Sequence, residues 1–177
     1  MPECDKTLVE RAARGDGESF TELCRRYYGP MVAISHAILG DRHLAEDAAQ
    51  EAFAKAARNL PRLRKADQFG RWVAAICRNE ARDLSRARRQ PRIDDETPEA
   101  QGPRRADETA EAVKAALNQL PSDSREVVFL RFYDGLSYDQ ISAVLGISEQ
   151  AINGRLRRAK RKLAEHLRRH GFDEVDL

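Results

Sequence analysis

The sequence has few aromatic residues, few cysteines and no long apolar run, and each of these absences argues against a class of protein. Aromatic residues make up 6% and charged residues 34% of the 177 positions, so one large core is disfavoured and two small ones are favoured. The cysteines form no Cys-x-x-Cys pair, which argues against a disulfide framework and a zinc knuckle. They are Cys4, Cys24 and Cys77, and we expect idle or buried thiols in a reducing cytosol.

Targeting, metal-binding and catalytic patterns are also lacking. The N-terminal residues MPECDKTLVERAARGDG have no signal-peptide pattern, and no run of about 18 apolar residues occurs, so we expect a cytoplasmic protein without membrane insertion. There is no Gly-rich phosphate loop and no nucleophile elbow. The four histidines are scattered and lack an acidic ligand set. We therefore expect no metal, no cofactor and no enzymatic activity.

Two short helices joined by a glycine turn are predicted within residues 136–163. Ser137 and Gln140 have the spacing of a capping box, and Gly146 suits the left-handed residue that ends a helix. Ser148 can cap the next helix. The apolar residues of that second helix recur at helical spacing: Ile152, Leu156, Ala159 and Leu163. The segment is therefore predicted to be a helix-turn-helix.

The second of these helices is strongly basic. From Glu149 to Leu163 six residues are basic and one is acidic, although the formal charge of the whole chain is only +2. Opposite the apolar stripe lie Gln150, Asn153, Gly154, Arg157, Arg158 and Arg161. Amides and guanidiniums can meet base edges and phosphates in a major groove. Because a capped helix and a glycine turn precede it, DNA binding is favoured over a merely solvated charged face.

A proline-rich segment divides the chain. Residues 90–107, QPRIDDETPEAQGPRRAD, contain three of the seven prolines and no apolar period, which indicates a linker. We therefore predict an all-α fold in which two small helical domains, residues 1–90 and 109–177, are joined by a flexible linker of residues 91–108. The C-terminal domain is expected to be a four-helix module that ends in the helix-turn-helix.

Prolines and capping residues predict further helix boundaries. Pro30 is expected either to start or to kink a helix. Pro121 should break a helix of residues 110–120, after which Asp123 with Glu126 is expected to start a capped helix.

Two helices of the N-terminal half have polar faces. A helix is predicted from about His43 to Asn59, with an alanine-rich face on one side and the polar residues Glu46, Asp47, Gln50 and Glu51 on the other. Any surface helix, however, shows charges opposite its apolar stripe. A helix from about Asp67 to Arg89 is expected to bury Trp72 in the core. Its exposed side carries Arg71, Arg78, Asn79, Arg82, Asp83 and Arg86, and Arg88, Arg89 and Arg92 extend the charge. Arginine pairs with phosphates and stacks on unpaired bases, so a second nucleic-acid surface is predicted.

The order and spacing of these parts resemble bacterial RNA polymerase sigma factors of the extracytoplasmic-function group. The resemblance covers nearly the whole chain. It is carried by LAEDAAQEAFAKAARNL (residues 44–60), by FGRWVAAICRNEARDLSRARR (residues 69–89), and by LNQLPSDSREVVFLRFYDGLSYDQISAVLGIS with the basic helix that follows. It implies an alternative sigma factor that binds core RNA polymerase and directs initiation at promoters with minus-ten and minus-thirty-five elements.

The resemblance also implies a partner for each polar surface. Glu46, Asp47, Gln50 and Glu51 would bind the clamp coiled coil of the largest polymerase subunit, and the C-terminal domain would meet the polymerase flap. Asn79, Arg82 and Asp83 would lie near melted minus-ten bases, with Arg78 and Arg86 on phosphates. At the minus-thirty-five element, Asn153, Gly154, Arg157 and Arg158 would face bases, accompanied by Gln150, while Ser148, Arg155 and Lys160 would hold phosphates. An anti-sigma factor is a further expected partner.

This sequence departs from the family pattern in the terminal helix. Lys or Arg is usual in place of Asn153, and Ser in place of Gly154, so the promoter sequence is poorly transferable from relatives. One rival interpretation stays open at this point: a one-component regulator whose N-terminal helices sense a ligand and whose helix-turn-helix binds an operator. That interpretation does not explain the acidic face.

Overall fold

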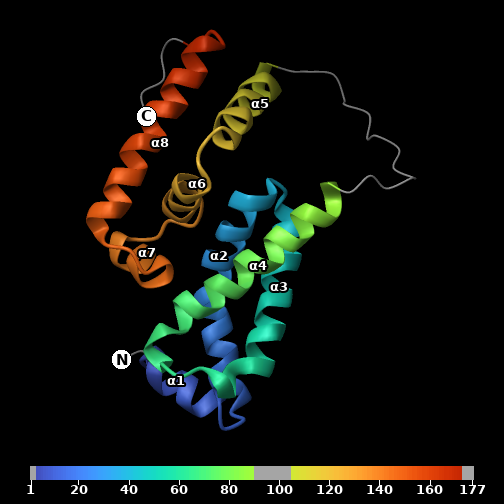
Figure 1. Ribbon diagram of the computed structural model, residues 1–177, viewed down its shortest axis with the longest axis vertical. Helices are drawn as coiled ribbons and strands as arrows, with labels where there is room; N and C mark the ends of the chain where they lie inside the picture. The colour runs from blue at the N-terminus through green and yellow to red at the C-terminus, as the bar shows by residue number, and fades with distance from the viewer. Residues whose placement is uncertain (1–2, 90–104, 173–177) are drawn as a thin grey trace.

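The computed structural model describes residues 3–89 and 105–172, and all regular secondary structure in these ranges is helical (Figure 1). The first range contains α1 (Asp5–Ala12), α2 (Gly17–Leu39), α3 (Arg42–Asn59), the 3-10 turns η1 (Leu60–Arg62) and η2 (Ala66–Gln68), and α4 (Phe69–Arg89). The second contains α5 (Arg105–Asn118), α6 (Ser122–Val128), the π-helical turn η3 (Phe129–Tyr133), α7 (Tyr138–Leu145) and α8 (Glu149–Arg169). The predicted all-α fold with a C-terminal four-helix module is confirmed.

The predicted linker lies largely outside the described residues. Of residues 91–108, only the last four are described, and they belong to the first turn of α5. The helix predicted over residues 110–120 therefore begins five residues earlier, at Arg105. Arg92, which was expected to extend the basic surface, also lies outside the described ranges.

Small side chains bring α2, α3 and α4 close together. Five alanines of α3 are fully buried, and α3 contacts both α2 and α4; they are Ala45, Ala48, Ala49, Ala52 and Ala56. The space between the helices is filled by larger buried side chains, among them Leu23, Met31 and Phe69. The predicted alanine face of α3 is thus confirmed as its packing surface, which leaves the opposite face free to meet something outside the bundle.

Helix α2 is continuous through Pro30, so a separate helix does not begin there. Proline disfavours helical backbone at the residue before it, partly through a clash with that residue's Cβ. The residue before it is Gly29, which has no Cβ. Gly40, at a φ of +68°, ends the helix in the left-handed conformation that glycine adopts readily.

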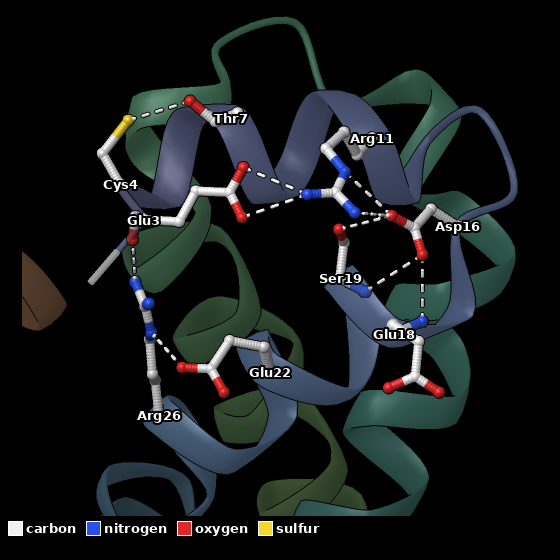
Figure 2. Close-up of polar contacts among 9 residues, drawn as sticks. All are labelled: Glu3, Cys4, Thr7, Arg11, Asp16, Glu18, Ser19, Glu22 and Arg26. Carbon is white, nitrogen blue, oxygen red and sulfur yellow. Dashed lines mark hydrogen bonds and ion pairs between the residues drawn. The ribbon is translucent and has the colours of Figure 1, made fainter. Parts of the chain in front are cut away.

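Ion pairs tie the first helix to the second (Figure 2). Arg11 donates to Glu3 at 3.1 Å and to Asp16 at 2.9 Å. Arg26 of α2 reaches back and donates to the Glu3 carbonyl at 2.7 Å and to the Asp5 carboxylate at 2.8 Å. These contacts hold α1 across the N-terminal end of α2.

Asp16 also caps α2. Its carboxylate accepts hydrogen bonds from the Glu18 and Ser19 amides at 3.1 and 3.3 Å and from the Ser19 hydroxyl at 2.8 Å. The Ser19 hydroxyl and, after it, the Arg11 guanidinium hold the pKa of Asp16 below its usual value. One carboxylate therefore serves as helix cap and as ion-pair partner.

The helix-turn-helix has the predicted caps. The Ser137 hydroxyl accepts from the Gln140 amide at 3.2 Å, and the Gln140 side chain accepts from the Ser137 amide at 2.8 Å. Gly146 has a φ of +68°, and Ser148 caps α8 by accepting from the Ala151 amide at 3.2 Å. The predicted apolar stripe of α8 is buried and continues to Leu167.

The capping box predicted for α6 is wrong. The helix begins at Ser122 with Pro121 in the N-cap position, where no side-chain cap bond forms. Asp123 consequently lies inside the first turn and pairs with Arg155 of α8 at 3.2 Å, while Glu126 faces the N-terminal half. In sequence, the spacing of Asp123 and Glu126 suits a capping box. In the structure, both acids instead form ion pairs with other helices.

The two halves pack against each other. The large apolar cluster of α1 to α4 continues into Val127, Leu130, Ile141 and Val144 of the C-terminal half. Helix α2 contacts α6 and η3, and α4 contacts α7 (Figure 1). Burial at this junction raises the pKa of Asp134 to about 6. A smaller cluster joins α5 to α8. The sequence predicted two helical units but not this shared core.

Asp16→Asn separates the capping role from the charge, because asparagine caps helices about as well as aspartate does. Asp16→Ala should melt at a lower temperature than Asp16→Asn at pH 7. Since the pKa of Asp16 is lowered in the folded state, its charge stabilises the wild type above about pH 4, and this stabilisation is lost as the pH falls through the folded-state pKa. The melting temperatures of wild type and Asp16→Asn should converge towards pH 3 in circular dichroism melts. A difference that stays constant with pH would contradict this role.

Candidate polymerase and nucleic-acid interfaces

The acidic face of α3 is exposed to solvent. Asp47, Gln50 and Glu51 are all exposed, whereas Glu46 is half-buried and accepts from Arg42 at 3.0 Å. Glu51 lies 3.3 Å from Arg58, but both side chains are more than half exposed. Exposed ion pairs contribute little, so this pair leaves Glu51 free to exchange partners. The face therefore presents carboxylates and an amide on one rigid helix.

A pocket of about 390 Å³ lies between α3 and α4. It is lined by Lys55, Asn59, Arg62, Trp72, Ile76, Asn79 and Glu80. Trp72 is half-buried: its ring packs 6.0 Å from that of Phe69, and it also lines the pocket. The Lys55 ammonium donates to Glu80 at 2.6 Å. The prediction that Trp72 belongs to the core thus holds for part of the side chain only.

Sequence reasoning found Asn79 but missed Lys55, Asn59 and Arg62 as members of this site. Each lies on α3 or in the turn after it, so the pocket is completed by residues some 20 positions before Asn79. The only signal available in the sequence was the basic loop between the two helices.

Two of the arginines predicted for α4, Arg82 and Arg86, share one exposed surface. Arg82, Asp83 and Arg86 are exposed, Asn79 lies beside them, and Arg86 pairs with Asp83 at 3.1 Å across one helical turn. Because these side chains are exposed, Arg82 and Arg86 remain available to bind an external anion. The surface is continuous with the pocket, because Asn79 belongs to both.

Arg78 is placed differently. It forms a forked ion pair with Glu126 of α6, with Nε 2.9 Å from Oε1 and Nη2 3.1 Å from Oε2. The two side chains are only 20% and 8% exposed. Removing one partner of a buried pair typically costs about 3–5 kcal/mol, because the other charge is left without compensation. In this arrangement the Arg78 guanidinium is therefore paired with a carboxylate of the C-terminal half.

The outer face of α8 presents a row of polar side chains. Gln150, Asn153, Arg157, Arg158 and Lys160 are exposed, and Ser148 lies at the start of the row with its oxygen engaged in the helix cap. Because Gly154 has no side chain, the surface of the row is recessed at its centre. A Cβ added there would contact only Arg158 Nη1, at 3.5 Å. Arg155 is turned towards Asp123 and is 22% exposed, so it anchors α8 to α6.

Comparison with known proteins identifies what these surfaces belong to. Residues 23–90 match the family Sigma-70 region 2, and residues 110–163 match Sigma-70 region 4. The RNA polymerase sigma-H factor of Pseudomonas aeruginosa is 32% identical over 182 residues, which cover 93% of this chain and 94% of that protein. The chain belongs to the sigma-70 family.

This sigma factor is also 30% identical over 175 residues to the ECF RNA polymerase sigma-E factor of Escherichia coli K12, and the match covers 88% of this chain and 90% of the relative. Among solved structures, CnrH in complex with the cytosolic domain of CnrY aligns with a TM-score of 0.65 at 28% identity, over 94% of this chain and 99% of that one. The sigma factor RpoE of Bartonella quintana shares the fold, with a TM-score of 0.56 at 24% identity over 85% and 98% of the chains.

These findings confirm the resemblance seen in the sequence. The protein is an alternative sigma factor of the extracytoplasmic-function group that directs transcription initiation, and it is not an enzyme. Within residues 3–89 and 105–172, no helix is long and apolar enough to cross a membrane. In the same ranges no group of three His, Cys, Asp or Glu side chains could hold a metal ion.

The thiols of this sigma factor differ in their surroundings. Cys77 is buried, donates to the Met31 carbonyl at 3.3 Å and lies 2.9 Å from the Ser35 hydroxyl. Burial raises the pKa of its thiol to about 11, so it stays protonated and unreactive near neutral pH. Burial also raises the pKa of Cys24, whereas a hydrogen bond from Thr7 lowers that of the exposed Cys4.

Gly154→Ala tests whether the glycine in α8 serves the fold. Alanine favours a helix interior by about 1 kcal/mol over glycine, and the added Cβ meets only an ordinary contact with Arg158. The variant should therefore unfold at a higher denaturant concentration than wild type in urea titrations followed by circular dichroism. An equal or lower midpoint would show that the fold itself needs the glycine.

Proposed function

We propose that this sigma factor divides its task among three surfaces: α3 for core polymerase, α4 with its pocket for the minus-ten element, and α8 for the minus-thirty-five element. The supporting observation is that the acidic and basic side chains of regions 2 and 4 lie on separate exposed faces of three helices. We further propose that residues 1–90 and 109–177 are the two functional domains, with residues 91–108 as linker. As part of the transcription apparatus, the protein would be cytoplasmic.

The exposed face of α3 suits a basic partner surface. Asp47 and Glu51 lie four residues apart, so they project from the same side of the helix, with Gln50 between them. We assign this face, with Glu46 at its edge, to the clamp coiled coil of the largest polymerase subunit. The flap would be met by the C-terminal domain.

The pocket between α3 and α4 suits a base turned out of the minus-ten strand. Unpairing a base costs a few kcal/mol, which a binding pocket and phosphate contacts must offset. The pocket offers the Trp72 ring for stacking and the Asn79 amide for hydrogen bonds. Arg82 and Arg86 lie next to it for phosphates, and Asp83 is within reach of the same strand. Arg78 would join them only after leaving Glu126.

The row on α8 suits the major groove of the minus-thirty-five duplex. Arg157 and Arg158 can contact guanine edges or phosphates, and Asn153 can make the paired hydrogen bonds that an amide offers adenine. The missing side chain at Gly154 permits a close approach of the helix to DNA. Gln150, Ser148 and Lys160 flank these residues, and Arg155 would contact a phosphate from its place beside Asp123.

Regulation by an anti-sigma factor is part of the proposal. RpoE of Bartonella quintana was solved in complex with the anti-sigma factor NepR, and CnrH in complex with the cytosolic domain of CnrY. A protein partner that covers the surfaces of α3 or α4 would keep this sigma factor from polymerase.

Reconstitution with core polymerase tests the proposal as a whole. The purified protein should give promoter-specific initiation at start sites mapped after its overexpression. A one-component regulator would instead bind a palindromic duplex alone and add nothing to core polymerase, and that result would overturn the proposed division.

Reversing the acidic face should weaken polymerase binding. Asp47→Lys with Glu51→Lys places two cations opposite a basic partner, and like charges across an interface cost several kcal/mol, so we expect more than about tenfold weaker core affinity. The control is Glu10→Lys with Glu165→Lys, which reverses two exposed acids elsewhere. Fluorescence titration with core enzyme measures both. Equal affinities for the two double variants would reject the assignment of α3.

Removing one guanidinium from α8 should affect one promoter element. Arg157→Ala is expected to cost about 1–3 kcal/mol of affinity for the minus-thirty-five duplex, the usual value for a base contact. Arg168→Ala, an exposed arginine near the end of the same helix, is the matched control. In transcription assays, the Arg157 variant should lose its sensitivity to minus-thirty-five substitutions. If it discriminates those substitutions as wild type does, Arg157 does not read this element.

A further inference from the structure

A pocket of about 650 Å³ lies between the C-terminal end of α2, α5, the C-terminal part of α6 and η3. Sites for small molecules commonly measure about 300–1,000 Å³ and combine apolar walls with a few polar groups. None of the lining residues belongs to the surfaces assigned to polymerase or promoter DNA, so the pocket is a separate site. We propose that it binds a small organic anion with a flat apolar body.

Most of the lining is apolar. His36 of α2 packs edge-on against Phe129 and Tyr133 of η3, with ring centres 4.9 and 5.2 Å apart. Val113 and Leu117 of α5 add aliphatic surface. Tyr133 and Val113 are 45% and 39% exposed, so this apolar surface is open to solvent. A flat ring system can stack on the aromatic side chains and cover the aliphatic ones.

Two cations of the lining lack a carboxylate partner. Arg125 of α6 is half-buried, and its Nη1 donates to the neutral side-chain oxygen of Asn118 at 3.2 Å. Glu126 is next in sequence, but its carboxylate is engaged by Arg78. Lys114 of α5 also lines the pocket and forms no ion pair within residues 3–89 and 105–172. The polar part of the pocket therefore carries positive charge.

A half-buried guanidinium without an anion is unusual, because buried charges are as a rule paired. Burial lowers the pKa of Arg125, and the neighbouring charge of Glu126 offsets this effect only in part. A carboxylate or phosphate in the pocket would supply the missing partner, since arginine binds both groups through forked hydrogen bonds.

Unpaired buried nitrogens also gather at this pocket. Three buried side-chain nitrogens of the described residues have no hydrogen-bond partner, and two of them, Arg125 Nε and His36 Nδ1, belong to its lining. Buried polar atoms are nearly always hydrogen-bonded, so such a pair is informative. Burial lowers the pKa of His36, which leaves the ring uncharged at pH 7 and suited to stacking.

Two variants test the charge and the space separately. Arg125→Gln removes the cation but keeps a hydrogen-bond donor, and Ala110→Trp places a large ring in the lining. The matched controls are Arg168→Gln, at an exposed arginine of α8, and Ala115→Trp, at an exposed alanine of α5 outside the lining. Circular dichroism melts establish that the full-length proteins are folded. Because Ala110 is exposed, its variant keeps the test valid if the loss of Arg125 weakens the fold.

The probe is anilinonaphthalene sulfonate, an aromatic anion whose fluorescence rises in apolar surroundings. Titration into the wild type should saturate at a single site. Arg125→Gln should weaken binding about tenfold or more, the usual effect of losing a hydrogen bond to a charged group, and Ala110→Trp should weaken it at least as much. Phenylnaphthylamine, which lacks the sulfonate, should bind the wild type and Arg125→Gln alike. Displacement of the dye by naphthoate or by naphthyl phosphate distinguishes a carboxylate from a phosphate as the preferred head group.

Weaker dye binding in both variants, with both controls like the wild type, supports the anion site. Equal affinity of the wild type and Arg125→Gln means that apolar surface alone holds the dye, and this result overturns the proposal. Affinity unchanged by Ala110→Trp places the dye elsewhere and overturns it as well, as does failure of both naphthoate and naphthyl phosphate to displace the dye. None of these outcomes depends on core polymerase, so they are independent of the proposed function.

Discussion

The close approach of α2, α3 and α4 is the constraint on which the other surfaces depend. It is possible because the inner face of α3 is built of alanine, whose side chain adds little width between helix axes. Any larger residue on that face would push α3 away from its neighbours and would widen the pocket it forms with α4. The same packing fixes the outer face of α3, so its carboxylates project from a rigid support. The surfaces proposed for polymerase and for the minus-ten strand therefore depend on the same alanine contacts.

Local patterns were sufficient to predict the helices and many of their ends. The alanine period of α3, the Ser137 capping box and the left-handed glycine at 146 each depend on residues within one or two turns, and each is present as predicted. The exposed rows of α3 and α8 followed from the same periodicity, because a buried stripe defines its opposite face. The roles assigned to those rows came from the family resemblance and remain proposals.

Features that join distant residues were not predictable in this way. The spacing of Asp123 and Glu126 suits a capping box, yet both acids form ion pairs with residues 32 and 48 positions away. The pocket beside Trp72 requires side chains from two helices whose relative placement no local pattern specifies. Leu130 and Ile141 of the C-terminal half join the core of the N-terminal half, a contact that no local pattern specifies. Periodicity identifies which residues are buried, but not against what.

The anchoring of α8 has a consequence for how such proteins diversify. The helix is held by its cap at Ser148, its buried stripe and the Arg155 pair with Asp123. The side chains at 153, 157 and 158 contribute little to holding the helix in place. Substitutions there can accumulate without loss of folding, and under the proposed role of α8 a duplicated copy of the gene could acquire a new set of target promoters in a few steps. The exposed residues of α8 can thus change while the contacts that hold the helix stay the same.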